Sequence, residues 1–207
     1  MNKQFIRRGL TLLSAVLIAA GACFISSANS DDGKETDSVN YHCDFEDGTL
    51  DELGIKTFST VTDITKNPQI TDDGIDGKSL KMYFGKVVAR NTVILPVELK
   101  EGHNYSVTLQ YKADNASKND ILNFHDMSGA WVSDDAGEII NKQRSKKENM
   151  LMYLFHTAKN RDWNTLKLGN SDIGTWSFSF SPTKEQMSDT NKYFALYFEN
   201  YAMSFED

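Results

Sequence analysis

The chain has 207 residues, of which 40% are hydrophobic and 11% aromatic, and its formal net charge at pH 7 is −7. This hydrophobic content is enough to build a buried core in one or two domains. The acidic balance argues against nucleic acid and anionic membranes as partners of the folded part, because both carry negative charge. Neutral ligands, cations and basic proteins remain as candidate partners.

Residues 1–28 have the pattern of an export signal. A positively charged start is followed by a mostly apolar segment, 10–20, that is short for a membrane-spanning helix. Small residues precede Cys23, as in bacterial lipoprotein signals, where the cysteine becomes the lipidated first residue; the leucine usual three places earlier is Ala20 here. An ordinary cut after Ala28 is the alternative. Both predict an exported protein, either free outside the cell or held at its surface as a lipoprotein.

Residues 29–40 are polar and charged, and we expect a flexible tether ahead of a domain that spans residues 41–207. Loss of the signal removes three positive charges and lowers the net charge from −7 to −10. Removal or lipidation of Cys23 leaves Cys43 as the remaining thiol, so no internal disulfide is predicted. We expect Cys43 to be a buried, small apolar residue near the first strand.

Within the domain, apolar and polar residues alternate over several short segments, the clearest being 79–84, 104–112, 173–180 and 193–199. A strand sends successive side chains to opposite faces, so each segment has one apolar face for a core. Turn residues recur between these segments, and no stretch reads convincingly as an amphipathic helix. The pattern predicts an all-β fold, an antiparallel β-sandwich (jelly roll) of about nine or ten strands.

Six motifs occur in an order that resembles the jelly-roll carbohydrate-binding modules appended to xylanases, glucanases and other glycan hydrolases. They are FEDGT (45–49), GKSLKM (77–82), LKEGHNYSVTLQYKA (99–113), WSFSFSP (176–182), YFALYFE (193–199) and SFED (204–207). The resemblance covers residues 41–207. It implies non-catalytic binding of a plant or microbial polysaccharide or oligosaccharide, by a module linked to or associated with a glycan hydrolase. The family's closing strand normally continues beyond the position of Asp207.

The resemblance also implies a structural calcium ion, for which the candidate ligands are Asp44, Glu46 and Asp207. Hard carboxylate oxygens at the start of one strand and the end of another suit Ca²⁺. The alternative is that these acids are simply solvated near turns, since no EF-hand spacing is present. Gly77-Lys78-Ser79 is expected to be a turn rather than a phosphate-binding loop, because Asp72 stands where that loop requires glycine.

Eight residues are candidate carbohydrate ligands, because aromatic rings stack on sugar C–H groups while amide and imidazole groups pair with hydroxyls. They are Tyr83, Gln110, Asn123, His125, Trp131, Tyr153, Trp163 and Tyr197. Most would lie on the polar faces opposite the core, and the two tryptophans at the rim. Ordinary cross-strand packing is the alternative for the tyrosines. Trp176 shares a face with Phe178 and Phe180, and we assign it to the core.

No catalytic constellation is recognisable in the sequence. The four histidines lack metal-ligand spacing, and neither a Gly-x-Ser-x-Gly elbow nor the Glu-x-Asp-x-x-Glu strand of jelly-roll hydrolases occurs. Two alternatives to a binding module stay open. One is a cell-surface adhesin or structural β-sandwich with a protein partner. The other is a glycan hydrolase or lyase, or a fragment of one, whose acids are not recognised.

Overall fold

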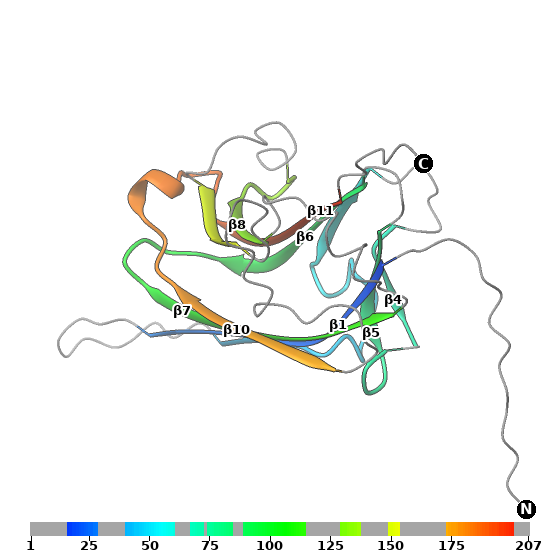
Figure 1. Ribbon diagram of the computed structural model, residues 1–207. Coiled ribbons are helices and arrows are strands. Elements are labelled where there is room, and N and C mark those ends of the chain that lie inside the picture. Colours follow the sequence, from blue (N-terminus) through cyan, green and yellow to red (C-terminus); the bar gives the residue numbers. More distant parts are fainter. Residues whose placement is uncertain are drawn as a thin grey trace, which may run out of the picture.

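The computed structural model describes residues 16–28, 40–60, 67–72, 74–84, 89–114, 129–137, 149–153 and 173–200. These residues form the strands β1 to β11 and a single 3₁₀ turn, η3 (Lys184–Gln186), with no α-helix among them. All strand pairs are antiparallel. The described part of the chain is therefore all-β, as predicted (Figure 1). None of its elements is a helix with the length and apolar character needed to cross a membrane.

The strands form two sheets. Sheet A has the order β10-β7-β1-β5-β4, with β2 also paired to β1. Its strands are β1 (Val16–Ala28), β2 (Asn40–Cys43), β4 (Gln69–Thr71), β5 (Ser79–Phe84), β7 (Asn104–Asp114) and β10 (Gly174–Phe180). Sheet B has the order β3-β6-β11-β8-β9. Its strands are β3 (Lys56–Ser59), β6 (Ala89–Glu98), β8 (Gly129–Ser133), β9 (Met150–Tyr153) and β11 (Tyr193–Asn200).

The hydrophobic core takes side chains from both sheets. Along β7, Tyr105, Val107, Leu109 and Tyr111 are all buried and alternate with polar residues, as the sequence pattern predicts. Phe178 of β10 and Phe194 of β11 bring the two sheets into contact, with ring centroids 6.4 Å apart. One apolar face of each sheet is therefore buried against the other.

Two further side chains have the burial that the sequence predicted. Trp176 lies in this core, stacked on the ring of Phe178 at 4.3 Å between centroids. Cys43 is buried while its neighbour His42 is exposed, so adjacent residues of β2 point to opposite faces. Burial raises the pKa of the Cys43 thiol.

Sheet B is buried on its second face as well. Ile94, Trp131, Ala195 and Tyr197 form a separate apolar cluster there. The indole ring of Trp131 meets the ring of Tyr197 edge-on, at 6.0 Å between centroids and 70° between planes. The face of β11 expected to be polar is therefore a second packing surface at Ala195 and Tyr197.

Strand β1 lies in the second half of the predicted export signal, residues 1–28. It runs between β7 on one side and β5 and β2 on the other (Figure 1). Residues 16–20 pair with β5 and 23–26 pair with β2, and the bulge opposite β7 falls at the change of partner, between Ala20 and Cys23. An uncharged apolar run suits a central strand as well as a signal. A cut at either position predicted from the sequence would remove part or all of β1.

Candidate functional site

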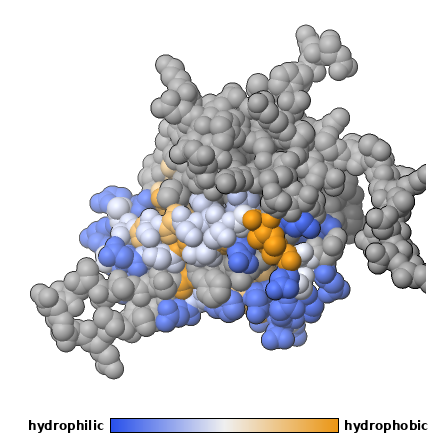
Figure 2. All heavy atoms as spheres, turned by 60° about the horizontal axis from the view of Figure 1, so that its bottom comes forward, coloured by the Kyte–Doolittle hydropathy of each residue, from blue (hydrophilic) through white to orange (hydrophobic). Residues whose placement is uncertain are grey.

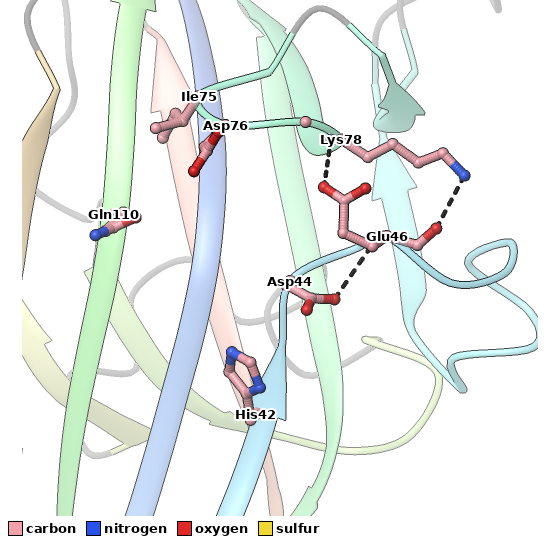
Figure 3. Close-up of a pocket in the computed structure, with 8 residues that line it drawn as sticks. His42, Asp44, Glu46, Ile75, Asp76, Lys78 and Gln110 are labelled. Atoms are coloured by element: carbon pink, nitrogen blue, oxygen red, sulfur yellow. Dashed lines mark hydrogen bonds between the residues drawn. The ribbon is translucent and has the colours of Figure 1, made fainter.

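An open pocket of about 430 Å³ lies on the outer face of sheet A. Its lining residues come from three separate segments: His42, Asp44 and Glu46 from β2 and the turn after it, Ile75, Asp76, Gly77 and Lys78 from the loop before β5, and Gln110 from β7. In Figure 3, β1 runs between the strand that carries Gln110 and the strand that carries His42. The backbone of β1 thus holds the two sides of the pocket together.

The first wall depends on an unusual turn after β2. Phe45 has a φ of 65°, in the left-handed region that non-glycine residues seldom occupy, and its side chain is buried in the core. Asp44 Oδ1 accepts a hydrogen bond of 3.1 Å from the Glu46 backbone N–H and so closes the turn. Burial of the Phe45 ring offsets a backbone cost of about 1–3 kcal/mol. The turn aims Glu46 at the loop before β5.

Glu46 and Lys78 join the first wall to the second (Figure 3). Glu46 Oε1 accepts a hydrogen bond of 2.6 Å from the Lys78 backbone N–H, and Lys78 Nζ donates one of 2.9 Å to the Glu46 carbonyl. Gly77 has a φ of 95°, and a Cβ there would overlap with the Glu46 carboxylate. Glycine is therefore required at this position by both backbone conformation and space. Gly77 and Lys78 end the loop before β5 and Ser79 is the first residue of the strand, so the predicted turn over 77–79 is the junction of loop and strand.

A buried serine, Ser79, stabilises the loop before β5. Ser79 Oγ accepts a hydrogen bond of 3.1 Å from the Ile75 backbone N–H, and the Gly74 N–H donates to the Gly77 carbonyl at 3.1 Å. These bonds close a compact loop over residues 74–79. Figure 3 shows Asp76 at its tip, with the carboxylate directed into the space between His42 and Gln110.

Beyond Gln110, the outer face of sheet A continues as a strip of exposed or half-exposed hydroxyl groups. Ser106 and Ser179 lie 3.1 Å apart between their hydroxyl oxygens, and Thr108 and Ser177 lie 3.2 Å apart. Gln110 is the next outward residue of β7 and stands opposite Thr175. Figure 2 shows this side of the molecule, with residues of intermediate hydropathy between strongly hydrophilic ones. We call these six side chains, of Ser106, Thr108, Gln110, Thr175, Ser177 and Ser179, the polar strip.

The lining of the pocket is acidic, but it contains both hydrogen-bond acceptors and hydrogen-bond donors. Carboxylates of Asp44, Glu46 and Asp76 provide acceptors, and the Gln110 amide and Lys78 ammonium provide donors. In the described segments, no group of three or more His, Cys, Asp or Glu side chains is arranged to hold a metal ion. Two of the carboxylate oxygens, those of Asp44 and Glu46, already accept hydrogen bonds that stabilise the walls of the pocket. The arrangement suits a neutral ligand rich in hydroxyl groups.

The predicted calcium ligands are partly brought together. Asp44 and Glu46 line the same pocket, but each accepts a hydrogen bond from a backbone N–H of the turn and loop. Asp207 lies outside the described residues. A calcium ion at this corner stays a prediction.

The predicted carbohydrate ligands are distributed over both sheets. Gln110 is exposed in the pocket wall, as that prediction requires. Tyr83 is a residue of β5 and Tyr153 of β9, in different sheets, and only their backbone positions are described. Asn123, His125 and Trp163 lie outside the described residues.

The expectation that Trp131 and Tyr197 offer ring faces to a sugar is corrected. Each is only 2% exposed, because they pack against one another on the second face of sheet B. Polar sequence neighbours suggested exposure of Trp131, and strand alternation placed Tyr197 on the face opposite the core. The burial of both comes from residues distant in sequence. Neither ring is available for stacking.

Among the pocket residues that were not predicted ligands, three have polar side chains: His42, Asp76 and Lys78. The alternation of β2, with Cys43 pointing inward, does place His42 on an outer face. Nothing local links it to Gln110 or Asp76, since the pairing of β2, β5 and β7 with β1 creates that neighbourhood. Comparison with known proteins adds no further assignment: no protein-family model matches the chain, and no curated protein or solved structure is significantly similar to it.

Proposed function

We propose that this chain is an exported, non-catalytic carbohydrate-binding protein with a jelly-roll β-sandwich fold. It binds a polysaccharide or oligosaccharide over the outer face of sheet A. The observation that supports this most directly is the polar strip, which leads along β7 and β10 into the pocket at Gln110. A run of hydroxyl and amide groups at strand spacing matches the repeated hydroxyls of a glycan chain.

The charges of the site favour a neutral glycan over an anionic one. Three carboxylates line the pocket with one lysine, and the entire chain is acidic. An anionic glycan would meet repulsion there, whereas sugar hydroxyls would donate to carboxylates and accept from Gln110 and Lys78. Affinity from such a shallow polar surface is expected to be modest, because each hydrogen bond to ligand replaces one to water.

Affinity electrophoresis of the intact chain, which contains β1, tests this proposal in gels cast with xylan, mixed-linkage glucan, mannan or pectin. Retardation by a neutral polymer is the expected result. Gln110→Ala combined with His42→Ala should weaken the retardation by about tenfold, given about 0.5–1.5 kcal/mol per lost hydrogen bond. The control variant Thr190→Ala, in the exposed turn before β11, should leave it unchanged.

Other outcomes of the same experiment separate the alternatives. A folded protein retarded by none of the polymers would contradict the proposal and favour a surface protein with a protein partner. Release of reducing sugar from a polymer would identify a glycan hydrolase. Retardation lost on calcium chelation would assign the implied ion to Asp44 and Glu46, which their alanine variants would then reproduce.

A further inference from the structure

The polar strip can exchange its hydrogen-bond donors and acceptors. In each hydroxyl pair, Ser106 with Ser179 and Thr108 with Ser177, either oxygen can be the donor. One of the two hydroxyl protons joins the pair, and the other is left to bond a ligand or water. Reversing the pair moves that outward donor to the neighbouring strand. The strip can therefore bind sugars that differ in hydroxyl configuration, and it contributes affinity rather than selectivity.

Most polar groups of the pocket are adaptable in the same way. The Gln110 amide can turn over to present either its oxygen or its nitrogen, and the neutral His42 imidazole can carry its proton on either nitrogen. Lys78 has donors only, but its ammonium group is directed to the Glu46 carbonyl, 2.9 Å away, and away from Gln110 (Figure 3). The carboxylates have a fixed role, because an ionised carboxylate can only accept hydrogen bonds.

Of the three carboxylates, that of Asp76 is best placed to meet a ligand. Asp44 Oδ1 and Glu46 Oε1 already accept hydrogen bonds from backbone N–H groups of the pocket walls. The Asp76 carboxylate points into the space between His42 and Gln110 (Figure 3). Asp76 is also exposed, so its two oxygens are accessible to a ligand in that space.

The backbone on both sides of Asp76 is fixed by hydrogen bonds. The Ile75 N–H donates to the hydroxyl group of the buried Ser79 at 3.1 Å, and the Gly77 carbonyl accepts from the Gly74 N–H at 3.1 Å. The loop therefore presents the carboxylate from a defined position. Such preorganisation lowers the entropic cost of binding.

We propose that Asp76 selects the ligand of the pocket by accepting hydrogen bonds from two adjacent hydroxyl groups of one sugar ring. This inference rests on the proposed function. Each carboxylate oxygen accepts from one hydroxyl, and two parallel charge-assisted hydrogen bonds are stronger and geometrically more selective than one. Adjacent hydroxyls lie close enough together when both are equatorial, or when one is axial and the other equatorial. The ligand class is therefore a neutral glycan with free adjacent hydroxyls, such as those at C2 and C3 of a 1,4-linked unit.

This site discriminates by linkage and by substitution. The internal units of a 1,3-linked chain have no two adjacent free hydroxyls, because the linkage uses the oxygen that both possible pairs share. A 1,4-linked unit with a substituent at C2 or C3 has lost its pair as well. Both kinds of chain can contact the polar strip, but they offer Asp76 a single hydroxyl at most positions and should bind more weakly.

Affinity electrophoresis of the intact chain tests this inference with xylan, mixed-linkage glucan and mannan, each before and after periodate oxidation and borohydride reduction. The treatment cuts the C–C bond between adjacent hydroxyls and leaves uncharged alcohols. We expect the wild type to bind the treated polymer about tenfold more weakly, because it loses hydrogen bonds to a charged group. Asp76→Asn should bind the untreated polymer about tenfold more weakly than the wild type does, and it should lose most of the preference for untreated over treated polymer.

Two control variants should keep that preference. Asp72→Asn removes the same charge from an exposed position that does not line the pocket, and we expect the affinity and the preference of the wild type. Ser106→Ala combined with Ser179→Ala removes one hydroxyl pair of the polar strip. This double variant should bind treated and untreated polymer more weakly by the same factor, about threefold to tenfold.

The outcomes separate this inference from the proposed function. A wild type that binds treated and untreated polymer equally would overturn the inference and leave glycan binding intact. An Asp76→Asn variant with the wild-type preference would also overturn it, since the altered shape of the treated polymer would then explain the preference. Equal weakening by Asp76→Asn and Asp72→Asn would do the same, because overall charge alone would be responsible. A folded wild type that no untreated polymer retards would contradict the proposed function itself, and this inference with it.

Discussion

Glu46 and Lys78 are connected twice, through the Lys78 backbone N–H to the Glu46 carboxylate at 2.6 Å and through Lys78 Nζ to the Glu46 carbonyl at 2.9 Å. The pair links the turn after β2 to the loop before β5, two segments that β1 otherwise holds together only through sheet pairing. The pocket walls therefore keep their spacing through this contact as well as through the sheet.

Glu46→Ala should lower the free energy of unfolding by about 1–3 kcal/mol, because the Lys78 N–H loses a charged acceptor. Urea denaturation of the intact chain measures this change. Asp47→Ala, which removes the same charge from the neighbouring exposed position, is the matched control and should cost less than about 0.5 kcal/mol. Equal losses in the two variants would mean that the contact is not significant for stability.

Gly174→Ala tests the close packing of β10 against β7. Gly174 stands opposite Tyr111, and an added Cβ would overlap with the aromatic ring of this buried tyrosine. We expect a loss of about 1–3 kcal/mol in the free energy of unfolding, as for overpacked cores. Thr175→Ala, at the next exposed position, should change it by about 0.5 kcal/mol or less.

A double-mutant cycle identifies the cause of that loss. If overlap with the ring is responsible, Gly174→Ala should cost less in a Tyr111→Leu background than in the wild type. The same cost in both backgrounds would show that the glycine is needed for some other reason.

The strands facing the core were predictable because period-two alternation is a local property. The alternating residues of β7 and β10, and the bounds of β5, are present in the sequence before any partner is known. No strand was predicted at the short β4, because its three residues give too few positions for alternation to show.

Burial of the second face of sheet B was not predictable in the same way. Whether the face with Tyr197 and Trp131 is exposed to solvent or packed depends on the segments that lie against it. The sequence of a single strand does not identify those segments. The pocket was not predictable for the same reason, because only the register of the paired strands brings His42, Asp76 and Gln110 together. The role of residues 16–28 was ambiguous for a different reason: an uncharged apolar run satisfies the requirements of both an export signal and a central strand.

Trp131→Ala should destabilise the fold rather than act on ligand binding. The indole is buried against Tyr197, Ile94 and Ala195, so truncation leaves a large cavity on the second face of sheet B. We expect a loss of about 3–5 kcal/mol in the free energy of unfolding. Glycan retardation of whatever fraction stays folded should be unchanged. Weakened retardation with unaltered stability would instead restore the interpretation of Trp131 as a sugar-stacking residue.

Stability should fall in acid through Glu98. Its carboxylate accepts hydrogen bonds from Lys192 Nζ at 2.7 Å and from the Tyr193 hydroxyl at 3.1 Å, and these lower the pKa of Glu98 below its ordinary value of 4.5. A carboxyl group with a lowered pKa in the folded state contributes stability above its unfolded pKa, and that contribution is lost as the pH falls through the folded pKa. The same contacts raise the pKa values of Lys192 and Tyr193, so their contribution is present at neutral pH and is lost as the pH rises through those values.

Glu98→Gln should therefore be less stable than the wild type near neutral pH, and the difference should shrink as the pH falls through the lowered pKa of Glu98, where the wild-type carboxyl becomes protonated as well. Urea denaturation of both proteins from neutral pH into acid measures the difference, which should be small because Glu98 is exposed, Lys192 and Tyr193 are partly exposed, and salt screens such surface charges. Glu101→Gln, in the turn before β7, removes the same charge and is the control. A difference between Glu98→Gln and wild type that stays constant from neutral pH to acid would show that the hydrogen bonds of Glu98 do not depend on its charge.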